Sequence, residues 1–367
     1  MCAELTDRAI DIDRFLALDE PPIPVTVLTG FLGSGKTTVL RHLLNQQALA
    51  DTAVIVNELG EVALDHVLLE EVSDRVLQLP SGCLCCGLRN DLVQTLRSLL
   101  DRATRAEIPA FERVVVETTG IADPAPIVQT MMSDPLRLSR YRLHTLVCTV
   151  DAELGAATLA RHRESPRQVA LADRLLLTKT DRASAAAIPA IEQRLRSLNP
   201  DAPIEPIVNG VIEAEVFFRK PAASRSNAAP VRQIDDGELL QHVHAERIRA
   251  YGLELHQPLP WDRFEAWLEE LVARHGERLL RVKGMIRVAG RARPVEVHGV
   301  QHVFHRPRAF EGAVSDNISR LTVIVDGVPE RDIAARLAVL SRAAQARPVS
   351  VARGGGIRAV SNRQEGE

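Results

Sequence analysis

One stretch near the amino end constrains the fold more than any other part of the chain. Residues 25–38 read Val-Thr-Val-Leu-Thr-Gly-Phe-Leu-Gly-Ser-Gly-Lys-Thr-Thr, an apolar strand followed by a glycine loop and the start of an apolar helix. Gly30, Gly35, Lys36 and Thr37 fit the phosphate-loop pattern G-x-x-x-x-G-K-[ST]. Glycines there permit positive φ angles, so that backbone N–H groups turn inward around a phosphate at the helix N-terminus. A chance glycine loop would not need the flanking strand and helix, and the stretch therefore predicts a nucleotide-binding protein.

Each polar residue of this loop has a predicted role. Lys36 is expected to reach the β- and γ-phosphate oxygens, and the hydroxyl of Thr37 is expected to bind Mg²⁺. The other candidate nucleotide-binding residues of the loop are Gly33, Ser34 and Thr38.

The composition excludes several classes of protein. A chain of 367 residues with 46% hydrophobic and 25% charged residues suits two soluble domains. The net charge of −3 argues against nucleic-acid or membrane-surface binding, and no apolar run approaches the roughly 20 residues that span a bilayer. Four aspartates within the first twenty residues argue against a secretory signal. We therefore expect a cytoplasmic protein, in which disulfides are rare.

From residue 24 the sequence alternates apolar strands with amphipathic helices, which predicts an α/β fold with a doubly wound, mostly parallel sheet. This P-loop NTPase domain is predicted to span residues 24–216, after an N-terminal arm at 1–23. The expected strands are 25–28, 53–56, 76–79, 114–117, 145–150, 174–178 and 204–207. The expected helices are 37–46, 88–104, 124–132, 166–172 and 185–198.

The pattern changes after a segment that is poor in large apolar residues, and we predict a linker at 217–244. A smaller α+β domain is expected at 245–345. Its predicted strands are 247–255, 279–288, 295–304 and 321–325, and its predicted helices are 261–275 and 333–344. The glycine-rich, polar tail at 346–367 is expected to be flexible.

A second nucleotide motif follows at residues 114–120, Val-Val-Val-Glu-Thr-Thr-Gly. An apolar strand that ends in an acid and is followed by glycine is typical of a Walker B strand. Glu117 is expected beside Mg²⁺, and the Gly120 N–H is expected to meet the γ-phosphate. The alternative is a buried strand with a terminal glutamate.

A third motif, Thr-Lys-Thr-Asp at 178–181, follows a later strand. Asp181 can accept two hydrogen bonds from guanine, which adenine cannot offer, so the motif favours GTP over ATP. The aliphatic stem of Lys179 is expected to cover the base. Thr178 stands where Asn is commoner, and we expect one supporting hydrogen bond to be weaker. Asn209 is a candidate for the remaining wall of the base site.

Three acids follow the strand at 53–56, where a switch segment is expected. Asp65 is a candidate for orienting the attacking water, and Glu58 and Glu61 are candidate ligands of a metal or of Mg²⁺-bound water. The alternative is a solvated acidic loop.

Three of the five cysteines, Cys83, Cys85 and Cys86, lie between a strand and a helix in Gly-Cys-Leu-Cys-Cys-Gly. A helix N-terminus lowers thiol pKa values and favours thiolates that bind soft cations. Adjacent cysteines cannot close a relaxed disulfide, and three thiolates leave a tetrahedral site open for another ligand such as Glu61 or water. Zn²⁺ is favoured, with Co²⁺ and Cu⁺ as alternatives. Buried packing cysteines or a redox pair would explain the same residues.

In this order, Gly-Phe-Leu-Gly-Ser-Gly-Lys-Thr-Thr, Asn-Glu-Leu-Gly-Glu-Val, Gly-Cys-Leu-Cys-Cys, Glu-Thr-Thr-Gly and Thr-Lys-Thr-Asp resemble the CobW family of GTP-hydrolysing metal chaperones. The resemblance covers about residues 24–342. It implies a slow GTPase whose nucleotide state controls delivery of Zn²⁺ or Co²⁺ to a client metalloprotein. It also implies that the three clustered cysteines carry metal, while Lys36, Thr37 and Glu117 serve the phosphates and Mg²⁺ and Asp181 serves guanine. Two departures are Ala63 in the switch segment and the lack of a long histidine-rich run.

Two other functions remain open at this stage. A metal buffer or sensor would keep the nucleotide as a structural element with negligible turnover. A small-molecule kinase would fit the phosphate loop but not the Thr-Lys-Thr-Asp and cysteine motifs. The expected partner is a client protein, bound by the C-terminal domain or the thiol face, and a homodimer is common among nucleotide switches of this kind.

Overall fold

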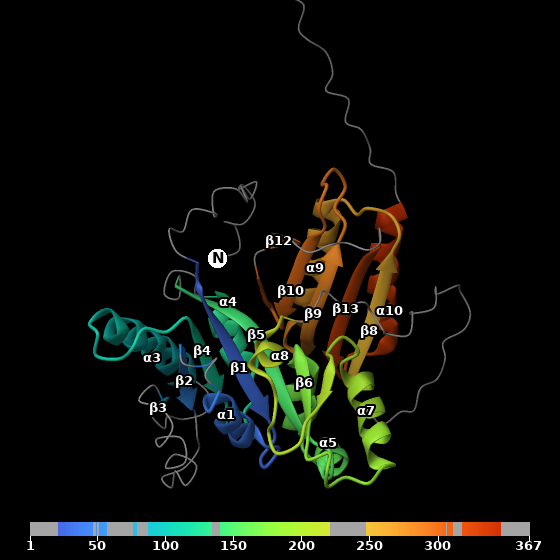
Figure 1. Ribbon diagram of the computed structural model, residues 1–367. Coiled ribbons are helices and arrows are strands. Elements are labelled where there is room, and N and C mark those ends of the chain that lie inside the picture. Colours follow the sequence, from blue (N-terminus) through green and yellow to red (C-terminus); the bar gives the residue numbers. More distant parts are fainter. Residues whose placement is uncertain are drawn as a thin grey trace, which may run out of the picture.

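The computed structural model describes residues 21–46, 49, 51–56, 76–78, 87–133, 140–220, 247–305, 307–310 and 318–345. Figure 1 shows two sheets, each with its own helices. Within the described residues, no helix is long and apolar enough to cross a membrane.

The first sheet has seven strands in the order β3-β2-β4-β1-β5-β6-β7, and all its pairings are parallel. Continuous β-branched and leucine runs form its centre because these strands are buried on both faces. The order predicts a crevice beside β1, since the chain leaves β1 in one direction to reach β2 and later returns to its other side at β5. The strands are β1 (Ile23–Gly30), β2 (Thr52–Val56), β3 (Val76–Gln78), β4 (Arg113–Glu117), β5 (Tyr141–Asp151), β6 (Arg174–Thr178) and β7 (Ile204–Pro206).

Helices cover both faces of this sheet. Val25 and Val27 of β1 pack into one cluster with residues of α3, α4, α5, α6 and α7, whereas Leu28 belongs to a second cluster with α1 and α8. The alternation follows from the two-residue period of a strand. The helices are α1 (Lys36–Leu44), α3 (Gly87–Thr104), α4 (Ala125–Ser133), α5 (Gly155–Arg161), α6 (Glu164–Leu171), α7 (Ala187–Leu198) and α8 (Ala214–Phe218).

The second sheet is antiparallel, with strands in the order β11-β10-β9-β13-β8 and β12 paired to β10. Val323 and Val325 of β13 face a cluster with α9 and α10, whereas Ile324 faces the helices of the first sheet. The second sheet is therefore covered on both sides. Its elements are β8 (Ile248–Leu255), α9 (Trp261–His275), the 3₁₀ turn η3 (Gly276–Arg278), β9 (Leu279–Ile286), β10 (Val295–Val300), β11 (Val303–Phe304), β12 (Arg308–Ala309), β13 (Ser319–Asp326) and α10 (Glu330–Gln345).

The predicted fold class is confirmed, and several details differ from the prediction. The strand predicted at 295–304 is a hairpin, because Gln301 adopts a φ of 55° between β10 and β11. Helices α5 and α8 were not predicted. Helix α8 also continues to Phe218, two residues into the range predicted as linker, because Phe217 is fully buried against the first sheet. Most of the predicted arm, the whole tail and most of the linker lie outside the described residues, and β1 already begins at Ile23, inside the range predicted as arm.

Two histidines lie on the β10–β11 hairpin, near the junction of the two units. The His305 N–H donates to the His298 carbonyl over 2.9 Å, and their ring centroids are 5.4 Å apart. Burial, with help from the charges of Arg308 and Lys220, lowers the pKa of His305 to about 4. The pKa of His298 is also lowered, first by burial and then by Arg281. Both rings are therefore neutral at physiological pH.

We expect the protein to lose stability as the pH falls from about 6.5 towards 4. In that window the unfolded chain takes up a proton at His305 and the folded chain does not. The free energy of unfolding therefore falls by at most about 1.4 kcal/mol per pH unit. Urea unfolding at pH values of about 7.5, 6 and 5 measures the slope. A His305→Gln variant should show a shallower fall, and equal slopes in both proteins would contradict the assignment to this ring.

Candidate functional site

The phosphate loop joins β1 to α1 in the conformation that its glycines allow. Gly30, Gly33 and Gly35 have φ angles of 141°, 69° and 97°, which lie in the region that disfavours other residues. A Cβ atom on Gly30 would lie 2.2 Å from the Thr149 hydroxyl and 2.5 Å from the Thr149 carbonyl oxygen on β5. The close approach of β5 therefore demands glycine at this position.

Polar groups hold the loop closed. Lys36 Nζ donates to the carbonyl oxygens of Gly30 at 2.9 Å and Phe31 at 3.2 Å. The Ser34 hydroxyl lies 2.7 Å from both the Phe31 carbonyl oxygen and the Thr149 hydroxyl. The lysine ammonium thus lies within the loop, at the N-terminus of α1, where an anion would be stabilised.

Thr37 and Glu117, predicted to serve Mg²⁺, lie together. The Thr37 hydroxyl donates to Glu117 Oε1 over 3.1 Å, which joins the first turn of α1 to the end of β4. A hydroxyl and a carboxylate are the hard oxygen donors that Mg²⁺ binds, usually with several waters. The donor set therefore fits this ion.

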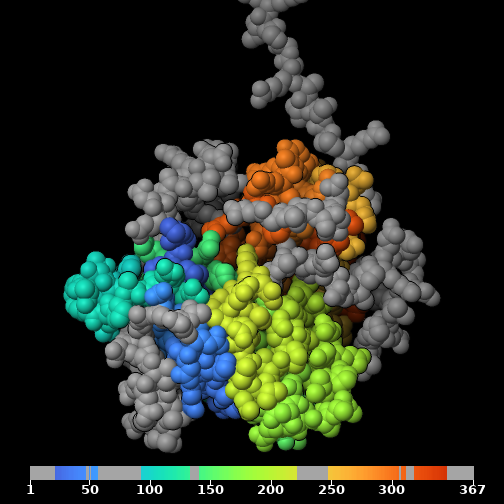
Figure 2. Space-filling model, viewed as in Figure 1, coloured from blue at the N-terminus to red at the C-terminus, as the bar shows by residue number. Residues whose placement is uncertain are grey.

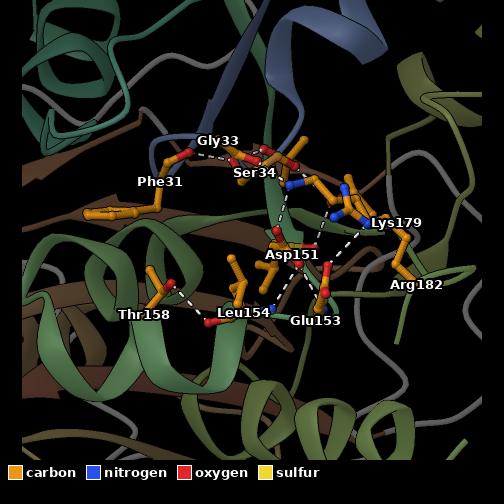
Figure 3. Close-up of polar contacts among 12 residues, drawn as sticks. Phe31, Gly33, Ser34, Asp151, Glu153, Leu154, Thr158, Lys179 and Arg182 are labelled. Atoms are coloured by element: carbon orange, nitrogen blue, oxygen red, sulfur yellow. Dashed lines mark hydrogen bonds and ion pairs between the residues drawn. The ribbon is translucent and has the colours of Figure 1, made fainter. Parts of the chain in front are cut away.

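The Thr-Lys-Thr-Asp motif, predicted to recognise the base, is bonded to the phosphate loop (Figure 3). The Thr178 hydroxyl donates to the Ser34 carbonyl oxygen over 2.7 Å, and a Val150 carbonyl lies 3.2 Å away. Lys179, with a φ of 55°, donates from Nζ to the Gly33 carbonyl oxygen over 2.7 Å. Thr178 thus supplies a link to the loop despite replacing the expected Asn.

Asp151, at the end of β5, supports this arrangement and was not predicted. Its Oδ2 accepts from Lys179 Nζ over 2.6 Å, and its Oδ1 accepts from the backbone N–H groups of Glu153 and Leu154. Burial alone would raise the pKa of Asp151, but these hydrogen bonds outweigh it and lower the pKa. Asp151 is therefore an anion that fixes the position of Lys179.

The remaining predicted base-site residues lie on neighbouring loops. Asp181 is exposed after β6, and Asn209 is exposed after β7 with a φ of 50°. A Cβ atom on Gly210 would lie 2.7 Å from the Thr38 carbonyl oxygen, so this loop lies directly against α1. In Figure 2 the yellow segment that contains this loop lies beside the blue segment that contains α1. The structure thus places both residues at the same edge of the sheet as the phosphate loop.

The turn after β4 contacts the phosphate loop and is held by α6. A Cβ atom on Gly120 would lie 2.6 Å from the backbone nitrogen of Leu32. The buried Gln168 side chain donates from Nε2 to the carbonyl oxygens of Gly120 at 3.1 Å and Ala122 at 3.0 Å. No sequence signal pointed to Gln168, because it lies in the middle of an amphipathic helix far along the chain.

The predicted switch and thiol residues all fall outside the described part of the chain. Glu58, Glu61, Asp65, Cys83, Cys85 and Cys86 lie outside the described residues. Within the part of the chain that the structure describes, no group of three or more histidine, cysteine or acidic side chains could hold a metal ion. Cys148 is fully buried on β5, and burial raises the pKa of its thiol to about 12. This cysteine therefore stays protonated and is a packing residue.

Strand order, glycine loop and clustered oxygen donors define a P-loop nucleotide-binding protein with an added antiparallel domain. Residues 24–206 match the CobW/HypB/UreG nucleotide-binding domain, and residues 248–341 match the C-terminal domain of the cobalamin synthesis protein cobW. The chain belongs to the CobW family, as its motif order indicated.

Relatives match most of the chain. The zinc chaperone YjiA of Escherichia coli is 34% identical over 327 residues, which cover 88% of this chain and 99% of YjiA. The crystal structure of Zn(II)-bound YjiA GTPase from E. coli has a TM-score of 0.65 and 29% identity, covering 88% of this chain and 99% of that one. The zinc-regulated GTPase metalloprotein activator 1 of Schizosaccharomyces pombe is 34% identical over 195 residues, covering 51% of this chain and 46% of the relative.

Proposed function

We propose that the protein is a GTP-hydrolysing zinc chaperone whose nucleotide state controls the capture and delivery of the metal. One observation carries the GTP part of this proposal: the Thr-Lys-Thr-Asp motif is bonded directly to the phosphate loop, through Thr178 to Ser34 and through Lys179 to Gly33. A guanine recognised by Asp181 and a phosphate chain bound at Lys36 would then occupy one continuous site. The words zinc chaperone and GTPase also stand in the names of similar proteins, YjiA and its zinc-bound crystal structure.

At the phosphate end, side chains and backbone N–H groups of the chain bind the phosphates and orient the attacking water. Lys36 and the backbone N–H groups of the loop neutralise the phosphate oxygens, and the Gly120 N–H meets the γ-phosphate. Thr37 and Glu117 would hold Mg²⁺, which would supply positive charge to the phosphate oxygens. Asp65 orients the attacking water.

At the base end, Asp181 accepts from guanine N1–H and the 2-amino group, and the Lys179 stem covers the ring. Asn209 forms part of the opposite wall. Since Lys179 is fixed at both Gly33 and Asp151, its stem is already ordered before the base arrives, which reduces the entropy lost on binding.

The metal part of the proposal rests on the cysteine motif and on the zinc-bound relative. Cys83, Cys85 and Cys86 bind Zn²⁺, with Glu61 or water as the fourth ligand, and Co²⁺ is the second candidate. The client metalloprotein docks on the C-terminal domain or the thiol face. The name of one relative, zinc-regulated GTPase metalloprotein activator 1, supports such a client.

We expect Zn²⁺ to bind at least about tenfold more tightly when GTP·Mg²⁺ rather than GDP·Mg²⁺ is bound, a free-energy difference typical of coupled sites. Titration against a chromophoric chelator measures both affinities, with the β,γ-imido analogue of GTP in the place of GTP. A Cys85→Ser, Cys86→Ser variant should lose the high-affinity site.

The matched control is Cys148→Ser, because Cys148 is buried and protonated and should leave zinc affinity unchanged. Equal zinc affinities in both nucleotide states would reject nucleotide control. If hydrolysis is also negligible, the protein is a metal buffer with a structural nucleotide.

A further inference from the structure

Helix α6 lies between the turn after β4 and the C-terminal sheet, and its side chains bond to both. Arg167 is the bridging residue. Its Nη1 lies 2.9 Å from Asp123 Oδ2 in the turn, and its Nη2 lies 3.2 Å from Asp326 Oδ2 at the end of β13. The Asp326 side chain is only 6% exposed. The planar guanidinium of Arg167 thus joins the nucleotide domain to the C-terminal sheet through two ion pairs, one to each aspartate.

The next residue on α6, Gln168, holds the same turn from within. Its Nε2 donates to the turn, to the carbonyls of Gly120 and Ala122, while its buried Oε1 has no hydrogen-bond partner among the residues that the structure describes. An unsatisfied buried oxygen is costly. The amide orientation is therefore fixed by the turn carbonyls.

Two further contacts restrict the conformation of this turn. Gly120 lies against the Leu32 backbone of the phosphate loop, with no room for a Cβ atom. Asp123 also accepts from the Ala125 N–H through Oδ1, at 2.9 Å, at the start of α4. A shift of Arg167 would therefore displace Asp123, and with it the first turn of α4 and Gly120.

The C-terminal sheet contacts α6 at its far end as well. Arg281 of β9 donates to the Leu171 carbonyl oxygen and to Asp173, just after α6. Helix α4 has its own contact, from Gln129 to Gln301 in the β10–β11 turn, at 2.5 Å. The two helices that flank the turn are thus both attached to the C-terminal sheet.

From this geometry we infer that Arg167 is a positioning residue through which the C-terminal sheet sets the γ-phosphate-sensing turn. Asp326 holds Arg167, and Arg167 with Gln168 holds the Gly120–Asp123 turn ready for a γ-phosphate. The inference rests on the proposed GTP binding and adds a regulatory input to it. A client that docks on the C-terminal sheet and displaces Asp326 would weaken GTP binding relative to GDP binding.

The test is an Asp326→Asn variant of the full chain, which changes no residue of the nucleotide site. Its affinity for the β,γ-imido analogue of GTP should fall about threefold to tenfold, within the range of long-range coupling. Its affinity for GDP should change less than about twofold, because GDP lacks the group that meets Gly120. A general loss of structure would lower both affinities together. The matched control is Glu254→Gln, which removes the charge of an acid on β8 that pairs with Arg320 on β13. It should change neither nucleotide affinity.

A double-mutant cycle separates Arg167 from Arg247, which also pairs with the Asp326 carboxylate, with its Nε 2.6 Å from Oδ1. In an Arg167→Gln background, Asp326→Asn should have no further effect on the ratio of the two affinities. An unchanged effect in that background would overturn the role of Arg167. Arg167→Lys, which keeps the charge but lacks the fork, should reproduce the Asp326→Asn result and serves if the latter variant folds poorly.

The outcomes are distinct from failure of the proposed function. If the unmodified protein binds neither nucleotide, the GTP proposal itself fails. If it binds both, and Asp326→Asn and Arg167→Lys leave the ratio of affinities unchanged, the inference is wrong while GTP binding stands.

Discussion

Replacing Lys36 by alanine is expected to lower kcat/KM for GTP hydrolysis by at least about a hundredfold, the usual effect of removing one preorganised group that stabilises transition-state charge. In the structure, the Lys36 ammonium is held at the Gly30 and Phe31 carbonyl oxygens, inside the phosphate loop. It therefore needs little rearrangement to reach a phosphate. Phosphate release measured under single-turnover conditions gives the rate, and GDP affinity measured in parallel separates binding from catalysis.

The fold should survive this change, because the hydrogen bonds of Lys36 to the Gly30 and Phe31 carbonyls lie within the phosphate loop itself. Lys220→Ala is the control for loss of a lysine, since Lys220 pairs with Glu296 in an exposed ion pair at 2.9 Å and should keep the full rate. Turnover by Lys36→Ala within tenfold of the unmodified protein would mean that hydrolysis does not depend on this loop. No turnover by either protein would favour the metal-buffer function.

The sequence predicted those parts of the site that depend on local chemistry. Glycine spacing around Gly30 and Gly35 fixes the loop because positive φ angles exclude most other residues. The end of β4 at Glu117 was predicted from a run of valines that only a strand buried on both faces explains. These features need no knowledge of distant residues.

Other parts of the site depend on tertiary contacts that no local pattern encodes. Arg167 and Gln168 meet the turn after Gly120 only because α6 packs beside β1 and β5, and neither belongs to a motif. Asp151 had a weak signal, since an acid at the end of a strand beside β1 falls at the crevice of a doubly wound sheet. Its hydrogen bond to Lys179 could have been proposed from the strand order, once the order was known.

The errors in secondary structure have similar causes. Helix α8 has five residues, too few for a helical period to show, and it is stabilised by burial of Phe217 rather than by propensity. The β10–β11 hairpin was taken for one strand because its turn has only two residues, one of them Gln301 at positive φ, where glycine or asparagine would have signalled it.

Replacing Asp173 by alanine is expected to lower the free energy of unfolding by about 3–5 kcal/mol, the cost of leaving a buried charge without its partner. Asp173 lies between α6 and β6, where Oδ2 accepts from the Leu146 N–H at 2.9 Å and Oδ1 pairs with Arg281. Lys283 Nζ lies 3.5 Å from the same oxygen. Burial alone would raise the pKa of Asp173, but the two cations outweigh it and hold the pKa far below its usual value. The variant would leave Arg281 and Lys283 buried without the carboxylate that they share.

Urea unfolding followed by circular dichroism measures the loss, and Glu330→Ala is the matched control. Glu330 pairs with Arg249 at 3.0 Å, but both side chains are about one-third exposed, so that removing this acid should cost less than about 1 kcal/mol.

Adding Arg281→Met to Asp173→Ala should recover part of the stability, because a buried pair replaced on both sides by apolar groups leaves fewer unpaired charges. A cost for Asp173→Ala no larger than that of Glu330→Ala would show that the junction of the two units does not depend on this carboxylate. Partial recovery in the double variant would instead place the electrostatic cost at Arg281, on the strand that attaches the C-terminal sheet to α6.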